Sequence, residues 1–311
     1  MKPDLIVTGK MYPPTLAALD AAYTTHKLFE TKDRDAMIAG VADRITAVAS
    51  SNSGGIDGAT MAKLPKLKTI SHFGVGYDTV DVDAARRRGI AVTNTPDVLT
   101  DDVADIAIAL LLATVRRIPQ GDRYVREGKW LKGAMALTDT IQGKSLGVIG
   151  IGRIGRAIAK RAEAFNLKVS YQGPNKKHDV TWPYYSDLVA LAKDVDFLIA
   201  ACPGGEATRG IVSRAVIDAL GPKGVFVNIS RGTVADEGAL LEALQQGRLG
   251  GAGLDVFVDE PKVPEGFFAL DNVVLQPHVG SASHQTRTAM GQLVIDNLAA
   301  HFAGKPLLTP V

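Results

Sequence analysis

Three charged residues, Arg231, Glu260 and His278, each stand just beyond a strand-like segment of the sequence. Arginine presents a planar fork of N–H groups that binds a carboxylate through two hydrogen bonds. Histidine exchanges protons near neutral pH, and a neighbouring carboxylate fixes its orientation and favours its protonated form. Together these side chains could bind a small carboxylic acid and deliver a proton to it.

Each of these residues alone has a simpler explanation. Arg231 could form a structural ion pair, Glu260 could be a solvated loop acid, and His278 could be a turn residue. The combination, however, provides what the reduction of a 2-oxo acid requires. The arginine would hold the carboxylate and stabilise charge on the carbonyl oxygen, and the histidine would protonate that oxygen as hydride reaches the carbon. We therefore expect an oxidoreductase that needs a bound hydride donor.

A glycine-rich turn provides a binding site for such a donor. The apolar segment 145–149 leads into the spacing G-x-G-x-x-G, and a helical pattern follows at once. In a dinucleotide site the first glycine makes the tight turn, the second admits the pyrophosphate, and the third lets the helix pack on the strand. The alternative is a purely structural glycine turn. We expect cofactor binding by the residues of this turn, which are Gly150, Ile151, Gly152, Arg153, Ile154 and Gly155.

The next strand-like segment, 168–171, indicates which dinucleotide binds. An NAD site usually has an acidic residue about 20 positions beyond the glycines, bonded to the ribose 2′-hydroxyl. Here no acidic residue follows the strand before Asp179, so no carboxylate at the strand end would repel a 2′-phosphate. We expect NADPH, with NADH as the alternative if this turn is an ordinary solvated loop. The expected contacts are Gly173, Pro174, Asn175 and Lys176.

The rest of the chain alternates short apolar segments with segments of helical period. This alternation predicts parallel sheets that are covered by helices on both faces. The expected strands are 5–8, 45–49, 69–71, 91–93, 145–149, 168–171, 197–200, 224–229, 251–254 and 272–275. The expected helices include 60–64, 84–88, 100–117, 153–165, 213–219, 236–246 and 283–302.

The order of these segments predicts an α/β protein with two Rossmann-like, doubly wound parallel-sheet domains. Residues 99–282 would form the NAD(P)-binding domain, inserted into a discontinuous substrate domain of residues 1–98 and 283–311. Ligands of open α/β sheets bind beyond the carboxyl ends of the strands. We therefore expect the active site in a cleft between the two domains.

The composition argues against several other classes of protein. A net charge of +2 over 311 residues is too small to indicate nucleic acid or a membrane surface as a partner. The apolar runs are shorter than the about 20 residues that a membrane span needs. The single cysteine, Cys202, permits no intrachain disulfide, and no spacing typical of metal ligands is present. We expect a cytoplasmic protein without a metal.

Several segments, in this order, resemble one family over essentially the whole chain. They are His72–Asp78, Thr93–Val98, the glycine turn, Asn228–Gly232, Leu254–Phe257, Glu260–Pro261 and Pro277–Gly280. They are similar to segments of the D-isomer-specific 2-hydroxyacid dehydrogenases. Within that family the chain most resembles the glyoxylate/hydroxypyruvate and hydroxyphenylpyruvate reductases, on the segments Asp101–Asp105, Asp122–Trp130, Ile217–Gly221 and Lys305–Pro310.

The resemblance implies a role for each matching residue. Arg231, Glu260 and His278 match the catalytic residues of the family. Val75 and Gly76 match the loop whose backbone N–H groups bind the substrate carboxylate, together with Arg231 and His278. The positions that match the nicotinamide end of the cofactor site are Ile229, Arg231, Asp255, which would accept a hydrogen bond from the carboxamide, and Gly280.

The resemblance also implies an activity and an assembly. It implies reduction of glyoxylate to glycolate and of hydroxypyruvate to D-glycerate, by a homodimer. The natural dimer interface is the helix 100–117 with the arm that follows it. A reductase of 4-hydroxyphenylpyruvate or of another 2-oxo acid is the alternative. A non-enzymatic dinucleotide sensor, similar to corepressors that resemble this family, is a more distant alternative.

Overall fold

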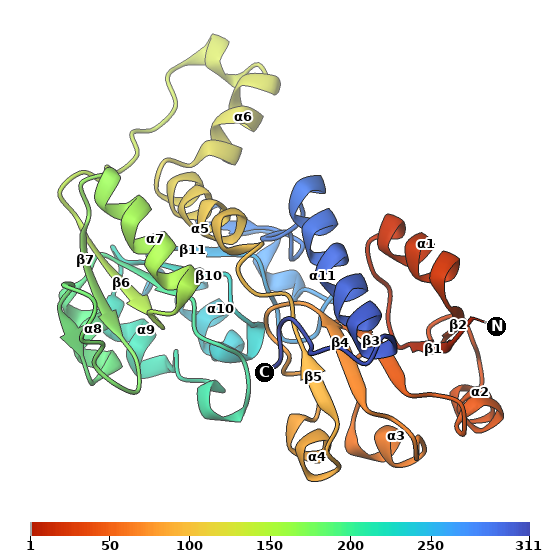
Figure 1. The fold of residues 1–311 in the computed structure, drawn as a ribbon. Coiled ribbons are helices and arrows are strands. Elements are labelled where there is room, and N and C mark those ends of the chain that lie inside the picture. The colour runs from red at the N-terminus through yellow and green to blue at the C-terminus, as the bar shows by residue number, and fades with distance from the viewer. Residues whose placement is uncertain (1) are drawn as a thin grey trace. The chain divides into compact units, whose positions relative to one another are not determined.

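The computed structural model describes residues 2–311, and this part of the chain divides into two compact units. The first unit is the chain up to Leu99 together with Ser283–Val311, and the second is Thr100–Ala282. Figure 1 shows both as α/β structures, the first in red, orange and dark blue and the second in yellow to light blue. The fold class predicted from the sequence, two parallel sheets with helices, is confirmed.

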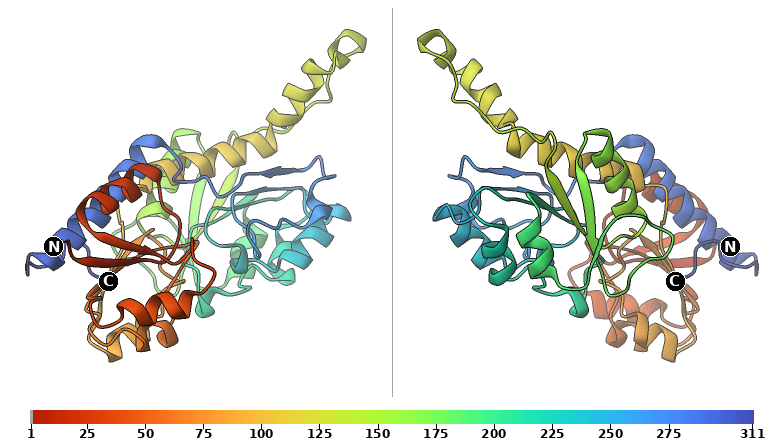
Figure 2. Two further views of the ribbon diagram at one scale, coloured as in Figure 1. Left: turned by 90° about the vertical axis from the view of Figure 1, so that its right-hand side faces the viewer. Right: turned by 90° about the vertical axis from the view of Figure 1, so that its left-hand side faces the viewer.

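The first unit contains a five-stranded parallel sheet of order β2-β1-β3-β4-β5. Helices α2, α3 and α4 pack on one face around Ile6, Val48 and Ile70. Helices α1 and α11 cover the other face, where α11 contacts β4 (Figure 2). The strands are β1 Asp4–Val7, β2 Thr24–Lys27, β3 Ala47–Ser51, β4 Thr69–Phe73 and β5 Ala91–Thr93. The helices are α1 Pro13–Ala22, α2 Arg34–Val41, α3 Gly58–Ala62, α4 Val82–Arg87 and α11 His284–Phe302.

The second unit contains a seven-stranded parallel sheet of order β12-β11-β10-β9-β6-β7-β8. Helices α5 and α7 pack against each other, and α5 also contacts β10 and β11. Helices α8, α9 and α10 form a separate apolar layer with the sheet. The strands are β6 Ser145–Ile149, β7 Lys168–Gln172, β8 Tyr184–Tyr185, β9 Phe197–Ala200, β10 Val225–Asn228, β11 Gly251–Leu254 and β12 Val273–Leu275. The helices are α5 Thr100–Val115, α6 Ile118–Arg126, α7 Arg153–Ala164, α8 Leu188–Asp194, α9 Arg214–Leu220 and α10 Glu237–Gln245.

The strand order of the second sheet places a switch point at β6. The chain leaves β6 for β7 on one side and returns to β9 on the other side of β6. The first β-α turn of such a sheet is where dinucleotides bind in doubly wound folds. The glycine turn lies directly after β6, so the topology puts it in this position.

Each segment predicted as a strand overlaps a strand of the structure, but two edge strands were not predicted. Strand β2 has the polar sequence TTHK and β8 is only two residues long, so neither carries an apolar pattern. The helix predicted over 100–117 ends at Val115. It ends there because Arg117 adopts a left-handed backbone conformation, with φ of 49°, and α6 then begins at Ile118.

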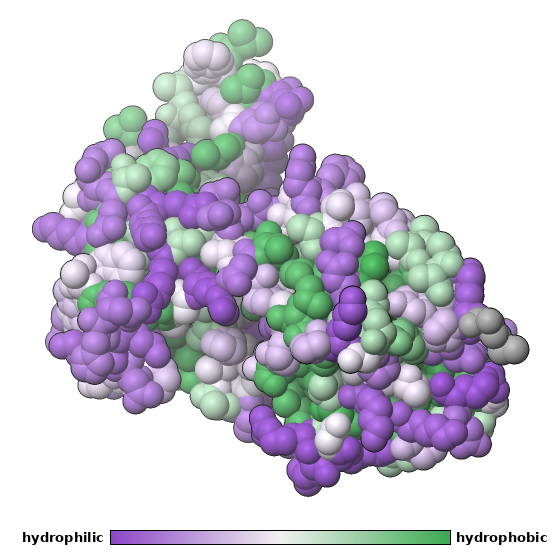
Figure 3. Space-filling view, viewed as in Figure 1, coloured by the Kyte–Doolittle hydropathy of each residue, from purple (hydrophilic) through white to green (hydrophobic). Residues whose placement is uncertain are grey.

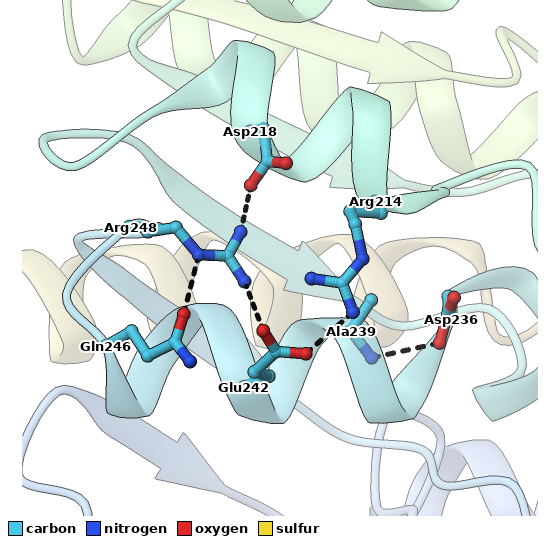
Figure 4. A network of polar contacts seen from close by, with 7 residues as sticks. All are labelled: Arg214, Asp218, Asp236, Ala239, Glu242, Gln246 and Arg248. Carbon is cyan, nitrogen blue, oxygen red and sulfur yellow. Dashed lines mark hydrogen bonds and ion pairs between the residues drawn. The ribbon is translucent and has the colours of Figure 1, made fainter.

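A polar network joins α9 and α10 on the outside of the second unit (Figure 4). Arg248 forms ion pairs with Asp218 of α9 and with Glu242 of α10, and Glu242 also pairs with Arg214 at 2.6 Å. Asp236 caps α10 by accepting a hydrogen bond from the backbone N–H of Ala239. Exposed pairs contribute about 0–1 kcal/mol each. The network therefore aligns the two helices more than it stabilises the unit.

An arm formed by α6, the 3-10 turn Lys129–Lys132 and the residues up to 140 extends away from the rest of the second unit (Figure 2). Helix α6 buries no residue. Trp130, Leu131 and Leu137 on the arm are 67%, 93% and 99% exposed. At the top of Figure 3 the arm shows green, hydrophobic residues among pale and purple ones. Within residues 2–311, no helix is both long and apolar enough to cross a membrane.

Candidate active site

His278 and Glu260 form a close hydrogen-bonded pair in the second unit. His278 follows β12, and its Nδ1 lies 2.7 Å from Oε2 of Glu260. The other carboxylate oxygen of Glu260 accepts a hydrogen bond from the backbone N–H of Phe257 at 3.1 Å. The two side chains are 33% and 34% exposed. Both can therefore exchange protons while they hold each other in one orientation.

The electrostatic surroundings keep Glu260 ionised. Burial opposes its charge, but the hydrogen bond from His278 and the charges of His278 and Arg231 outweigh burial, so the pKa of Glu260 lies below its usual value. An ionised Glu260 is the hydrogen-bond acceptor that orients the imidazole and stabilises its protonated form.

The turn after β10 positions Arg231. Its backbone carbonyl accepts a hydrogen bond from Asn228 Nδ2 at 2.9 Å, and its Nη1 donates to the carbonyl of Ser230. Gly232 follows, and a Cβ there would lie 1.9 Å from the carbonyl carbon of Phe257. Only glycine allows these turns after β10 and β11 to approach so closely. Arg231 and Glu260 come from these two turns, so this contact brings them near each other.

Asp255 fixes the loop that carries His278. This buried residue directly follows β11, and its two carboxylate oxygens accept hydrogen bonds from the backbone N–H groups of Val279 and Gly280 at 2.7 and 2.9 Å. Burial raises the pKa of Asp255, while these two bonds oppose the rise. His278 itself has a φ of 53°, a backbone conformation that persists only where neighbours hold it. The sequence did not predict this anchoring role, because it depends on the pairing of β11 with β12 in the finished sheet.

The glycine turn has the geometry that a pyrophosphate requires. Gly150 has a φ of 90°, and a Cβ at Gly155 would lie 2.1 Å from the carbonyl oxygen of Gly150. Gly152 is the N-cap of α7 and makes no side-chain cap, and a Cβ there would meet nothing within 4 Å. The start of α7, at Arg153 and Ile154, therefore opens onto free space in which backbone N–H groups can bind phosphate. The residues of the turn fit a dinucleotide.

The residues predicted to contact the 2′-phosphate lie in the loop after β7. Gly173 is buried and its carbonyl accepts a hydrogen bond from the Tyr184 hydroxyl at 3.1 Å. Pro174, Asn175 and Lys176 are exposed. They follow the strand next to β6, so they stand at the same edge of the sheet as the glycine turn.

In the first unit, the carbonyl groups of the loop after β4 accept hydrogen bonds from neighbouring residues. The carbonyl of Gly74 accepts a hydrogen bond from Thr95 N, and that of Val75 accepts one from Asn94 Nδ2. The carbonyl of Gly76 accepts a hydrogen bond from Nε2 of the buried His72 at 3.0 Å. The N–H of Gly74 bonds the carbonyl of His72, so the N–H groups of Val75 and Gly76 are the ones available to an anion. The anchors His72 and Asn94 were not predicted as site residues.

The family model described as "D-isomer specific 2-hydroxyacid dehydrogenase, NAD binding domain" matches residues 108–280. The chain belongs to this family. This confirms the resemblance that the sequence motifs indicate, and it establishes the second unit as the location of a nicotinamide dinucleotide-binding domain.

Relatives of known name agree with this assignment. The chain is 51% identical to glyoxylate/hydroxypyruvate reductase A of Arabidopsis thaliana over 293 residues, which are 94% of each protein. It is 54% identical to the hydroxyphenylpyruvate reductase of Plectranthus scutellarioides over 270 residues, 87% of this chain and 86% of that one. It matches the NADPH-dependent glyoxylate/hydroxypyruvate reductase of Sinorhizobium meliloti, solved with NADP and malonate, with a TM-score of 0.93 at 44% identity over 100% of this chain and 97% of the other.

Proposed function

We propose that this chain is an NADPH-dependent reductase of small 2-oxo acids, with glyoxylate and hydroxypyruvate as its preferred substrates. The observation that carries the proposal is the 2.7 Å contact between His278 and Glu260, with Arg231 on the turn that packs against the turn before Glu260. The products are glycolate and D-glycerate. The cofactor, when bound, supplies a hydride to C2 of the oxo acid.

The side chains of the second unit then bind the substrate carboxylate, stabilise the charge on the C2 oxygen and protonate that oxygen. Arg231 binds the substrate carboxylate and stabilises the developing charge on the C2 oxygen. Because Nδ1 of His278 donates to Glu260, its Nε2 is the atom that delivers the proton to that oxygen. Glu260 stays ionised and stabilises the imidazolium until the proton leaves.

The first unit contributes the backbone N–H groups of Val75 and Gly76 to the substrate carboxylate. The carbonyl groups of this loop are held by hydrogen bonds from Thr95, Asn94 and His72. These bonds support the anion-binding role of the loop. On this proposal the unit of Thr100–Ala282 is the cofactor domain and the other unit is the substrate domain. Ile229 and Asp255 line the nicotinamide, and Gly280 lies beside them.

The deciding experiment measures NADPH and NADH oxidation side by side with glyoxylate, hydroxypyruvate, 4-hydroxyphenylpyruvate and pyruvate. We expect the highest kcat/KM with NADPH and either of the first two acids. The 54% identity to a hydroxyphenylpyruvate reductase makes 4-hydroxyphenylpyruvate the second candidate. Oxidation with none of the acids, in a protein that still binds the dinucleotide, would instead favour a non-enzymatic sensor.

We also propose that the protein is a homodimer whose interface includes the arm. Trp130, Leu131 and Leu137 expose apolar side chains that a monomer would leave in water. Replacing Leu131 and Leu137 with Asp should convert the dimer to a monomer in sedimentation analysis. A wild-type protein that sediments as a monomer at micromolar concentration would contradict this assembly.

A further inference from the structure

One arginine of α7 joins the glycine turn to the loop after β7. Arg156 lies on the first turns of α7, where its backbone N–H bonds the carbonyl of Gly152. Its Nε donates to the carbonyl of Ile151 at 3.3 Å, inside the glycine turn. Its two terminal nitrogens reach the two carboxylate oxygens of Asp179 at 2.9 and 2.8 Å. This is a bidentate ion pair, the arrangement that matches the arginine fork best.

Asp179 is the first acidic residue after β7. In a dinucleotide domain, an acid in this part of the chain either binds the ribose 2′-hydroxyl or repels a 2′-phosphate. The hydrogen bond from Arg156 holds the pKa of Asp179 below its usual value, so the carboxylate is ionised at neutral pH. Its charge is nevertheless compensated by the guanidinium that it binds.

Two tyrosines anchor the loop independently of the ion pair. The hydroxyl of the buried Tyr171 accepts a hydrogen bond from the backbone N–H of Lys177 at 2.8 Å. The hydroxyl of Tyr184 donates to the carbonyl of Gly173 at 3.1 Å, and the two rings pack with centroids 5.4 Å apart. The loop between Gly173 and Lys177 therefore has contacts that do not involve Arg156. Removing Arg156 should change the charge of this region more than its shape.

We propose that Arg156 sets the preference for a 2′-phosphorylated cofactor by neutralising Asp179. This inference rests on the proposed NADPH preference. With the pair intact, Lys176 and Lys177 face the phosphate without an opposing charge. Without Arg156, the Asp179 carboxylate offsets one of these lysines and becomes an acceptor for a 2′-hydroxyl. Arg156 thus acts through Asp179 as a positioning and charge-setting residue, without itself binding the cofactor.

The test uses the adenosine ends of the two cofactors, so it does not depend on turnover. Titration calorimetry gives the Kd of 2′,5′-ADP and of 5′-AMP for the wild type, Arg156→Gln, Asp179→Asn and the double variant. Arg156→Gln should lower the preference for 2′,5′-ADP by roughly tenfold at low salt, less at high salt. Asp179→Asn should keep or increase the preference, and the double variant should regain most of what Arg156→Gln loses.

The matched control is Arg161→Gln, on the same helix. Arg161 pairs with Asp105 at 2.6 Å and with Asp101 at 3.0 Å, so this variant makes the same change in net charge without touching the loop. Its nucleotide preference should equal that of the wild type. Melting temperatures close to wild type for all variants, as expected for an exposed pair, confirm that folding is not the cause.

Two results would overturn the inference. A double variant as poor as Arg156→Gln would mean that the guanidinium binds phosphate directly or only braces the loop. An unchanged preference in Arg156→Gln would mean that the pair has no role. A wild type without preference for 2′,5′-ADP would refute the proposed NADPH dependence instead. In that case the ratio of the Kd of 2′,5′-ADP to that of 5′-AMP would still show whether Arg156→Gln changes the preference.

Discussion

The carboxyl ends of the two parallel sheets carry different kinds of polar residue. In the first unit, the loop at Val75 and Gly76 is held by hydrogen bonds from His72, Asn94 and Thr95, all of which are buried. In the second unit the strand ends carry charged groups, and two of them, Glu260 and His278, remain about one third exposed.

This difference follows from what each region is proposed to do. Backbone N–H groups can hold an anion without a buried counter-charge, provided that their carbonyl partners are fixed. Proton transfer needs side chains that change charge, and a charge without a partner or solvent is costly to bury. The comparison teaches that anion binding can be assigned to the loop of the first unit and proton transfer to the strand ends of the second unit. Each role can then be tested by its own variants.

The largest expected effect comes from His278→Ala. We expect kcat to fall by roughly 10²- to 10⁴-fold, because the proton donor is lost, while the Kd of NADPH measured by fluorescence titration stays within about twofold. His26→Ala, a histidine of β2 that pairs with Asp4, is the control and should keep the wild-type kcat. Wild-type turnover in His278→Ala would show that His278 is not the proton donor. The proposed division, with proton transfer in the second unit and anion binding in the first, would then be wrong.

Asn94→Ala tests the anion-binding role proposed for the loop at Val75 and Gly76. The variant frees the carbonyl of Val75, so the loop loses one anchor and KM for the oxo acid should rise roughly tenfold with a much smaller change in kcat. Removing a buried donor should also lower the free energy of unfolding by about 1–3 kcal/mol.

Thr69→Val separates these two effects. Thr69 is also buried in the first unit, but its hydroxyl bonds the imidazole of His301 at 2.9 Å instead of the loop. It should destabilise the protein to a similar extent and leave KM unchanged. If both variants raise KM equally, the loop responds to general loss of stability and not to its own anchor.

Glu260→Gln gives a pH-dependent effect with a defined sign. The pKa of Glu260 is lower in the folded protein than its ordinary value of 4.5, so ionisation of this group favours folding. Its contribution is fully present above that ordinary value and is lost as the pH falls through the folded-state pKa. The difference in unfolding free energy between wild type and Glu260→Gln should be fully present at about pH 5 and shrink at lower pH. Urea unfolding from pH 3 to pH 7 measures it, and a difference that grows on acidification would contradict the pairing with His278.

The smallest effect is expected from Arg248→Ala. This residue is charged and belongs to the second unit, but its partners Asp218 and Glu242 lie on α9 and α10, away from the strand ends. We expect a loss of about 0–1 kcal/mol in urea unfolding and an unchanged kcat. A large loss of activity would show that a charged residue far from the strand ends also affects turnover. A position at a strand end would then not be what makes a charged residue of the second unit important for catalysis.

The parts of the fold that follow local patterns could be predicted from the sequence. Apolar, β-branched segments such as 145–149 and 197–200 are strands in the structure with the same bounds, because their residues are buried on both faces of a parallel sheet. The polar β2 and the two-residue β8 lack that pattern and were missed. Ser283, at the predicted start of the last helix, caps α11 by accepting a hydrogen bond from Thr286 N.

The candidate site was predictable only in part. Arg231, Glu260 and His278 were selected by residue type and by position after a strand, and the structure puts the last two in contact. Their catalytic roles, like those of Val75 and Gly76, remain predictions. The anchors could not be found in the same way, because Asp255 acts on residues beyond the next strand and Asn94 acts on a loop 19 positions earlier. Such contacts depend on the finished sheet order and not on any local pattern.

The discontinuous first unit has a consequence for how the chain folds during synthesis. Its sheet is completed by the end of the chain, since α11 packs on β4 and the backbone of Val311 bonds that of Val92. The second unit, Thr100–Ala282, is continuous and can fold as soon as its last residue leaves the ribosome. The loop at Val75 and Gly76 is made early, but the unit that supports it waits for residues 283–311. A released chain that ends at residue 282 should therefore resist protease over residues 100–282 and be cleaved in its first 99 residues.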